Sequence, residues 1–144
     1  MVPMDAPPSA GVHQSPTAFR PFFEAMLRDH DMIRAAEIPV ERARGPILMI
    51  SGEADAMWPA TELAEIAEHR AAGRGFTHDL THLRYPGAGH LCGGVPGTPA
   101  ATESRHPVTG QVYSFGGSPA GKAQARADSW PRVLQFLLNG SNAR

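Results

Sequence analysis

The alternation of hydrophobic and polar positions predicts two strands joined by a helix in the middle of the chain. Residues 47–50 are an unbroken apolar run with turn-forming residues on either side, which is typical of a strand covered on both faces in a parallel sheet. Residues 59–72 carry apolar side chains at three- and four-residue intervals, as one face of a helix does. A second strand is predicted at residues 80–85. These elements predict two parallel strands joined by a right-handed crossover.

The segments before this unit are predicted to be an arm, a helix and a connection. Residues 1–18 lack periodicity and are predicted to be disordered or to form an extended arm. Residues 19–36 repeat apolar side chains at helical spacing, and Pro21 fits the first turn of a single helix. Residues 37–44 follow as a connection, with residues 38–40 extended because the residue before a proline avoids the helical region.

The segments after the unit are predicted to be a long loop and a last helix. Residues 91–117 are rich in glycine, threonine and proline, and within them residues 111–115 are a candidate short strand. Loops of this length in compact domains are usually functional or disordered. Ser118 is predicted to cap a helix that ends near Gly140. Pro131 should either kink this helix or mark its true start after a second, Asp-Ser cap.

The loops after the two predicted strands each hold one side chain suited to acid–base chemistry, Asp55 in the first and His90 in the second. Because the carboxyl ends of parallel strands lie at the same end of a sheet, these side chains are expected to touch. A carboxylate in contact with an imidazole fixes its tautomer and stabilises the imidazolium that forms when the ring takes a proton. The order of acid before histidine is that of the α/β-hydrolases, in which the nucleophile precedes both.

Length and composition predict one domain that needs neither a metal nor disulfides to stabilise it. The chain has 144 residues and a single cysteine, Cys92, so no disulfide can form within it, and this usage fits a reducing, cytoplasmic compartment. The formal net charge of −1 does not favour nucleic acid or an anionic membrane as a partner. Neither an N-terminal signal peptide nor a membrane span of ~20 apolar residues is predicted.

Three segments of the chain resemble one protein family. They are GEADAMW around Asp55, RYPGAGH up to His90, and ADSWPRVLQFL near the C-terminus. Together they resemble the C-terminal domain of the acyl-CoA thioesterase / bile acid-CoA:amino acid N-acyltransferase family. The resemblance assigns residues 19–140 to that domain, with residues 1–18 as an arm and residues 141–144 as a tail.

The resemblance implies an α/β fold, and within that class the C-terminal portion of an α/β-hydrolase that is incomplete in this chain. Family members act on acyl-CoA thioesters through a serine or cysteine nucleophile. Thioesterases release the acyl-enzyme to water, and acyltransferases release it to an amine such as glycine or taurine. By position, Asp55 matches the family's acid and His90 its general base. Acyl-CoA is then the substrate, and no cofactor is implied.

One part of the family's pattern has no counterpart in the chain. The family's nucleophile lies upstream of the acid in a Gly-x-Ser/Cys-x-Gly turn, but the serines upstream of Asp55, which are Ser9, Ser15 and Ser51, lack the flanking glycines. The N-terminal β-sandwich domain of the family is missing too. We therefore expect a chain that is inactive alone, with the nucleophile on another chain or on a longer product.

Simpler structural interpretations are open for the residues around the expected pair. Asp55 is also explained as a turn aspartate that bonds its own backbone, and His90 as a loop histidine after a glycine turn. Glu53 is the alternative acid, although a solvated turn residue is the favoured interpretation. Trp58 and Trp130 are interpreted as core or loop-packing aromatics.

Three further candidates for chemistry are weaker. His78 and His82 would share a face of a strand and could bind a metal, but no third ligand is indicated and a surface strand is favoured. Cys92 follows the histidine in the wrong chain order for a nucleophile, so a small buried or loop residue is favoured. Ser118 lies in a Gly-x-Ser-x-Ala pattern, but Pro119 lacks the backbone N–H that would stabilise an oxyanion, which favours a helix cap.

Three functions are open at this point. The first is the acyl-CoA thioesterase or N-acyltransferase domain with a separate nucleophile. The second is a non-catalytic remnant or binding module of the same fold, and the third is a fragment of a serine hydrolase of the dienelactone-hydrolase or prolyl-peptidase kind. Besides acyl-CoA, the expected partners are a chain that carries the nucleophile, or a second copy bound at the unpaired edge of the strand at residues 47–50.

Overall fold

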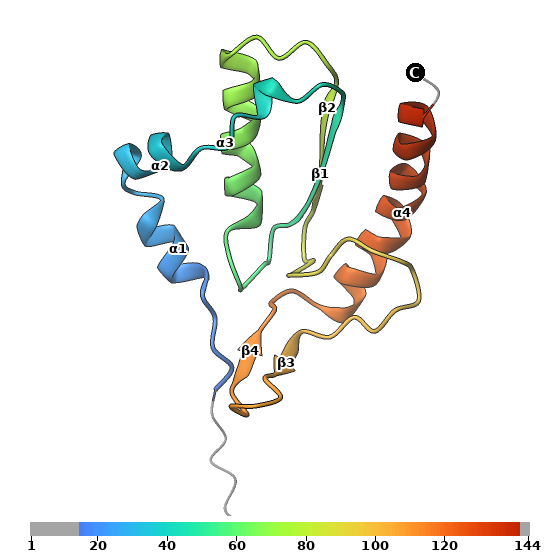
Figure 1. Cartoon of the computed structure of the whole chain (residues 1–144). Helices are drawn as coiled ribbons and strands as arrows, with labels where there is room; N and C mark the ends of the chain where they lie inside the picture. The colour runs from blue at the N-terminus through green and yellow to red at the C-terminus, as the bar shows by residue number, and fades with distance from the viewer. Residues whose placement is uncertain (1–14, 142–144) are drawn as a thin grey trace, which may run out of the picture.

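The structure is a computed structural model that describes residues 15–141. A two-stranded parallel sheet lies at its centre and connects its main elements. The strands pair in register from Ile47 with Leu80 to Gly52 with Tyr85. In chain order the elements are α1 (Arg20–Met26), α2 (His30–Ala36), the 3-10 turn η1 (Val40–Arg42), β1 (Ile47–Gly52), α3 (Ala60–Gly73), β2 (Leu80–Tyr85), β3 (Glu103–Arg105), β4 (Val112–Ser114) and α4 (Pro119–Ser141) (Figure 1).

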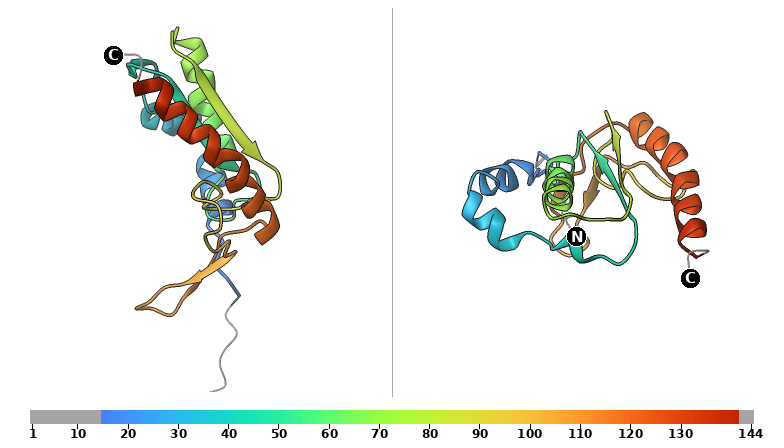
Figure 2. Two further views of the ribbon diagram at one scale, coloured as in Figure 1. Left: turned by 90° about the vertical axis from the view of Figure 1, so that its right-hand side faces the viewer. Right: turned by 90° about the horizontal axis from the view of Figure 1, so that it is seen from above.

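Helices α3 and α4 lie on opposite sides of the β1–β2 sheet and both pack against its strands (Figures 1 and 2). Helix α3 joins the two parallel strands and begins directly after Pro59, which takes the capping position. Helix cover on both faces explains why β1 is apolar along most of its length. The predicted strand–helix–strand unit with parallel strands is confirmed, and the fold class is α/β.

The single helix predicted at residues 19–36 is wrong, because α1 and α2 are two short helices with a break between them. Asp29 lies at the break, and its Oδ1 accepts hydrogen bonds from the backbone N–H groups of Asp31 at 3.0 Å and Met32 at 2.9 Å. A side chain that caps the second helix in this way starts a new helix direction. The expectation of an extended segment at residues 38–40 also fails in part, since Val40 opens η1.

The long loop after β2 contains a small antiparallel hairpin made of β3 and β4. Strand β4 falls inside the predicted candidate strand, whereas β3 is exposed and polar and has no sequence signal. Thr17 pairs with β4: its N–H donates to the carbonyl of Val112 at 2.8 Å, and its carbonyl accepts the N–H of Ser114 at 2.8 Å. The end of the predicted arm is therefore paired with this hairpin, and residues 1–14 lie outside the described part of the chain.

Helix α4 begins at the predicted cap, because the Ser118 hydroxyl accepts the N–H of Gly121 at 3.0 Å. The helix continues through Pro131, so the alternative start after an Asp-Ser cap is wrong. Ser141 is the last residue of this helix, and residues 142–144 lie outside the described range.

Two buried cations on α4 hold the glycine- and proline-rich start of the long loop. The guanidinium of Arg126 donates to the backbone carbonyls of Leu91 at 2.9 Å and Thr98 at 2.9 Å, and the ammonium of Lys122 donates to the carbonyl of Ala101. Lys122 is fully buried, and burial lowers its pKa. Because buried charges need partners, these carbonyls fix the loop against the helix without regular secondary structure.

Candidate active site

The side chains of Asp55 and His90 meet where β1 and β2 end. Asp55 follows β1 by three residues, and His90 follows β2 by five. The loops that carry them lie at the same end of the parallel sheet. Nδ1 of His90 is 2.9 Å from Oδ2 of Asp55. The Asp55 residue is 3% exposed and the His90 side chain 15% exposed. The predicted contact is present, and the catalytic role of the two residues stays a prediction.

The two carboxylate oxygens of Asp55 have different partners. Oδ1 accepts the backbone N–H groups of Met57 at 2.7 Å and Trp58 at 3.3 Å, as in an Asx-turn. Oδ2 is then free to face His90. The turn fixes the direction of the carboxylate. Asp55 is therefore both a turn aspartate that bonds its own backbone and the partner of His90.

A third segment, just after β4, fixes the separation of the two loops. The carbonyl of Phe115 accepts the backbone N–H of His90 at 2.7 Å and that of Ala56 at 3.4 Å. Gly116 follows with a φ of +66°, and a Cβ at this position would lie 2.1 Å from the carbonyl oxygen of Ala54. Only glycine fits such a close approach of two backbones. The hairpin therefore sets the geometry of the pair, a contribution that the sequence analysis missed.

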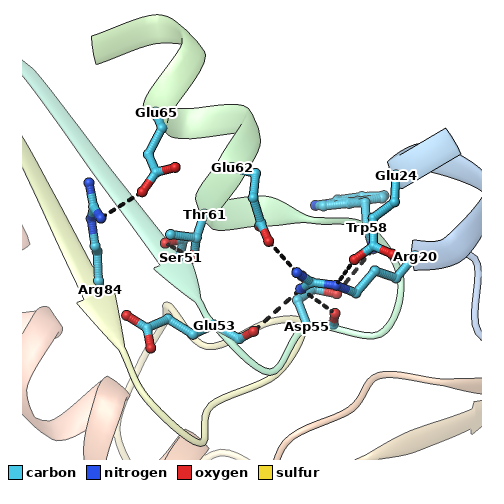
Figure 3. A network of polar contacts seen from close by, with 10 residues as sticks. All are labelled: Arg20, Glu24, Ser51, Glu53, Asp55, Trp58, Thr61, Glu62, Glu65 and Arg84. Atoms are coloured by element: carbon cyan, nitrogen blue, oxygen red, sulfur yellow. Dashed lines mark hydrogen bonds and ion pairs between the residues drawn. The ribbon is translucent and has the colours of Figure 1, made fainter. Parts of the chain in front are cut away.

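Arg20 joins α1 to the loop that carries Asp55 (Figure 3). Its guanidinium donates to the backbone carbonyls of Asp55 at 3.2 Å and Glu53 at 3.3 Å, and it pairs with the carboxylates of Glu24 and Glu62. Burial acts to lower the pKa of Arg20, but the hydrogen bonds and charges of the two glutamates outweigh it and raise the pKa. The exposed side chain of Glu53 points away from this network, so Glu53 contributes its carbonyl and not an alternative acid.

Two aromatic rings lie against the imidazole of His90. The Trp58 ring is edge-on, with its centroid 4.4 Å from that of the imidazole, and the Phe115 ring is at 5.6 Å. Trp58 remains 38% exposed, which makes it a loop-packing aromatic beside the site. Within the described residues Nε2 of His90 has no hydrogen-bond partner, so this nitrogen is available to a reacting group.

Comparison with known proteins identifies the domain that carries this site. Residues 14–141 match the family model described as "BAAT / Acyl-CoA thioester hydrolase C terminal". The chain belongs to this family. Its fold is accordingly an incomplete α/β-hydrolase fold, as the resemblance implied.

Individual relatives are thioesterases and N-acyltransferases. The chain is 32% identical to the mouse peroxisomal succinyl-coenzyme A thioesterase over 100 residues, which is 69% of this chain and 23% of that protein. It is 32% identical to human acyl-coenzyme A thioesterase 6 over 109 residues, 74% of this chain and 25% of that protein. It is 37% identical to mouse acyl-coenzyme A amino acid N-acyltransferase 1 over 100 residues, 69% and 24% of the two chains. The chain spans about a quarter of the length of these relatives.

This thioester hydrolase C-terminal domain also contains a buried hydroxyl–imidazole–carboxylate row, which the sequence analysis missed. Nε2 of His82 is 2.7 Å from the Ser51 hydroxyl, and its Nδ1 is 3.3 Å from Oε2 of Glu68. The Ser51 hydroxyl is also 2.9 Å from that of Thr61. Ser51 is 2% exposed and the His82 side chain 1% exposed, so no thioester can reach the hydroxyl. These contacts join both strands to α3. Because the His82 side chain is buried, its predicted location on a surface strand is wrong.

The remaining candidates do not contribute to the Asp55–His90 site. His78 precedes β2 and packs on Phe76, with ring centroids 5.6 Å apart, and no group of three or more potential metal ligands occurs among the described residues. Cys92 is buried, and burial raises the pKa of its thiol, which disfavours the reactive thiolate. Ser118 caps α4 as predicted. No helix in the described part of the domain is long and apolar enough to cross a membrane.

Proposed function

We propose that this domain supplies the acid and the general base of an acyl-transfer site for acyl-CoA thioesters, and that the nucleophile comes from outside the residues described. The observation that carries the proposal is the 2.9 Å contact between Asp55 and His90 in a domain whose relatives are thioesterases and acyl-CoA N-acyltransferases. The buried carboxylate, oriented by its backbone donors, supports the role of Asp55.

In this reaction His90 carries the proton and Asp55 stays ionised. With a proton on Nδ1 facing Asp55, Nε2 takes the proton of a serine hydroxyl or cysteine thiol as that atom attacks the thioester carbonyl. The bond from the nucleophile to the acyl carbon forms, the carbon–sulfur bond breaks, and the imidazolium gives its proton to the CoA thiolate. Water or an amine then attacks the acyl carbon and gives a proton to Nε2, the bond from that carbon to the nucleophile breaks, and the imidazolium returns the proton to the released oxygen or sulfur.

The proposal is tested by replacing the nucleophile with a small molecule. The full chain is mixed with an acyl-CoA and hydroxylamine, and a thiol indicator reports released CoA as the acyl group passes to nitrogen. General-base assistance by His90 should raise the rate above the protein-free reaction by about 10²-fold, the lower end of the range for such catalysis. His90→Ala should abolish the increase.

Two controls separate this site from the other histidines and hydroxyls. His78→Ala removes an exposed imidazole, and Ser51→Ala removes the only serine hydroxyl that bonds a histidine within the described residues. Both variants should keep the rate increase. An increase that survives His90→Ala, or no increase with any acyl-CoA tried, contradicts the proposal, and the second result favours a non-catalytic binding module.

A further inference from the structure

Helices α1 and α2 and the turn η1 form an arch over the outer face of α3, away from the sheet (Figures 1 and 2). Ion pairs attach both ends of this arch to α3. At one end Arg20 pairs with Glu62, in the first turn of α3. At the other end Arg70, in the last turn of α3, pairs with Glu37 at 2.7 Å and with Glu41 at 2.7 Å.

The space between these two attachments is an open groove, lined in its larger part mostly by ionisable residues and in its smaller part mostly by aliphatic ones. It consists of two adjoining hollows of about 730 Å³ and 310 Å³, within the size range of small-molecule sites. The smaller hollow is walled mainly by aliphatic side chains, which are Leu27, Ile33, Ile38, Leu63, Ile66 and Ala67. Neither α1 nor α2 has a buried residue, and Ile38 is 74% exposed and Leu63 39% exposed. These apolar walls are therefore not filled by the arch itself.

An aromatic connection runs from the groove to the imidazole of His90. The Trp58 ring contacts that imidazole, and the Phe23 ring lies edge-on to Trp58 with centroids 6.3 Å apart. Phe23 is on α1 and Leu27 is its C-cap, one turn further on, so the two side chains lie on the same side of this helix. Pro59, directly after Trp58, lines the larger hollow. These contacts place aromatic and aliphatic side chains between His90 and the smaller hollow, which Leu27 lines.

We propose that the arch groove binds the hydrocarbon chain of the acyl group, with the thioester carbonyl beside Trp58 and His90. This inference rests on the proposed function, since it identifies the acyl chain as the part of the substrate that the domain recognises. An unbranched hydrocarbon fits the apolar walls, and the ionic groups at both ends of the arch remain paired without it. Ile38, Leu63 and Ala67 then determine which chain lengths bind.

The test measures binding without chemistry. Saturated fatty acids of increasing length are titrated into the full chain by calorimetry, and NMR spectra of methyl groups locate the site. Each added methylene that enters the groove should tighten binding about fourfold, the equivalent of the transfer free energy of one buried CH₂. The methyl signals of Leu63 and Ile66 should shift.

Exposed positions allow variants that leave folding intact. Ile38→Asp and Leu63→Asp each place a charge in the groove and should weaken binding of the longest acid at least tenfold. Ala67→Phe should shorten the longest chain that binds. Val108→Asp, at a residue 87% exposed on the hairpin loop, is the matched control and should bind as the unmodified chain does.

Three results would overturn the inference. They are an affinity that does not depend on chain length, an equal loss of binding in Val108→Asp, and methyl shifts that map outside the groove. Groove methyls that are already shielded from solvent before any acid is added would assign the groove to a protein segment or a second copy instead. Because fatty-acid binding requires neither a nucleophile nor a proton transfer, a failure of the hydroxylamine test would leave this result unchanged, and the reverse also holds.

Discussion

At the scale of residues, the charged side chains of this domain act mostly as fixed connections between segments. Glu41 in η1 illustrates this, because Arg70 of α3 donates two hydrogen bonds to its carboxylate, at 2.7 Å and 2.9 Å. The hydrogen bonds from Arg70 are the main cause that lowers the pKa of Glu41 from 4.5 to about 2. A carboxyl group with a depressed pKa in the folded state favours folding only when it is ionised.

The Glu41–Arg70 pair predicts a loss of stability in acid. Its contribution is fully present above pH 4.5, where Glu41 is ionised in both states, and is lost as the pH falls from 4.5 to about 2. The melting temperature of Glu41→Gln, followed by circular dichroism, should therefore fall less steeply over this interval than that of the unmodified chain. Glu103→Gln, at an exposed glutamate that forms no ion pair within the described residues, is the control. Parallel curves for Glu41→Gln and the unmodified chain would contradict the assignment.

At the scale of elements, β1 has one edge that no strand covers within the described residues. The N–H of Ile47 bonds the carbonyl of Asp79 across the sheet at 2.8 Å. Since backbone groups alternate along a strand, the N–H of Met49 also faces β2, whereas those of Leu48 and Ile50 face the open edge. Open edges of this kind promote pairing with other strands.

Hydrogen exchange should show this alternation. In dilute solution the amides of Leu48 and Ile50 should exchange much faster than the amide of Met49, which faces the paired strand β2. If the edge binds a second copy, as expected from the sequence, light scattering should show a dimer at higher concentration, and both edge amides should become protected together. Slow exchange of Leu48 and Ile50 in a monodisperse monomer would contradict both parts of this prediction.

The sequence predicts the elements whose hydrophobic period is unbroken and fails where tertiary contacts decide. β1, α3 and β2 follow from apolar runs and turn residues, and the positions of Asp55 and His90 follow from the strand ends. The break between α1 and α2 depends on Asp29, which has the same polarity as an exposed helical residue. The Ser51–His82 contact depends on how β1 and β2 pair, and the position of the Phe115 carbonyl depends on the hairpin, so neither has a periodic signal.

At the scale of the whole molecule, the arch, the sheet and the hairpin meet at the end of the sheet where β1 and β2 stop. The arch reaches it through Arg20, the sheet through Asp55 and His90, and the hairpin through the carbonyl of Phe115. The domain spans about a quarter of the length of its relatives. This arrangement supports both proposals: the domain orients the acid–base pair and the acyl chain, and the attacking group comes from outside the described residues.

The most direct test of the central claim is the position of the proton on the His90 ring. Long-range ¹H–¹⁵N NMR at a pH where the ring is neutral distinguishes a proton on Nδ1 from one on Nε2. Because the hydrogen bond of one ring nitrogen determines where the proton lies, Asp55 should hold it on Nδ1, and Asp55→Asn should remove this preference. A proton mainly on Nε2 in the unmodified chain, or no change in Asp55→Asn, would contradict the claim that this pair is built for general-base chemistry.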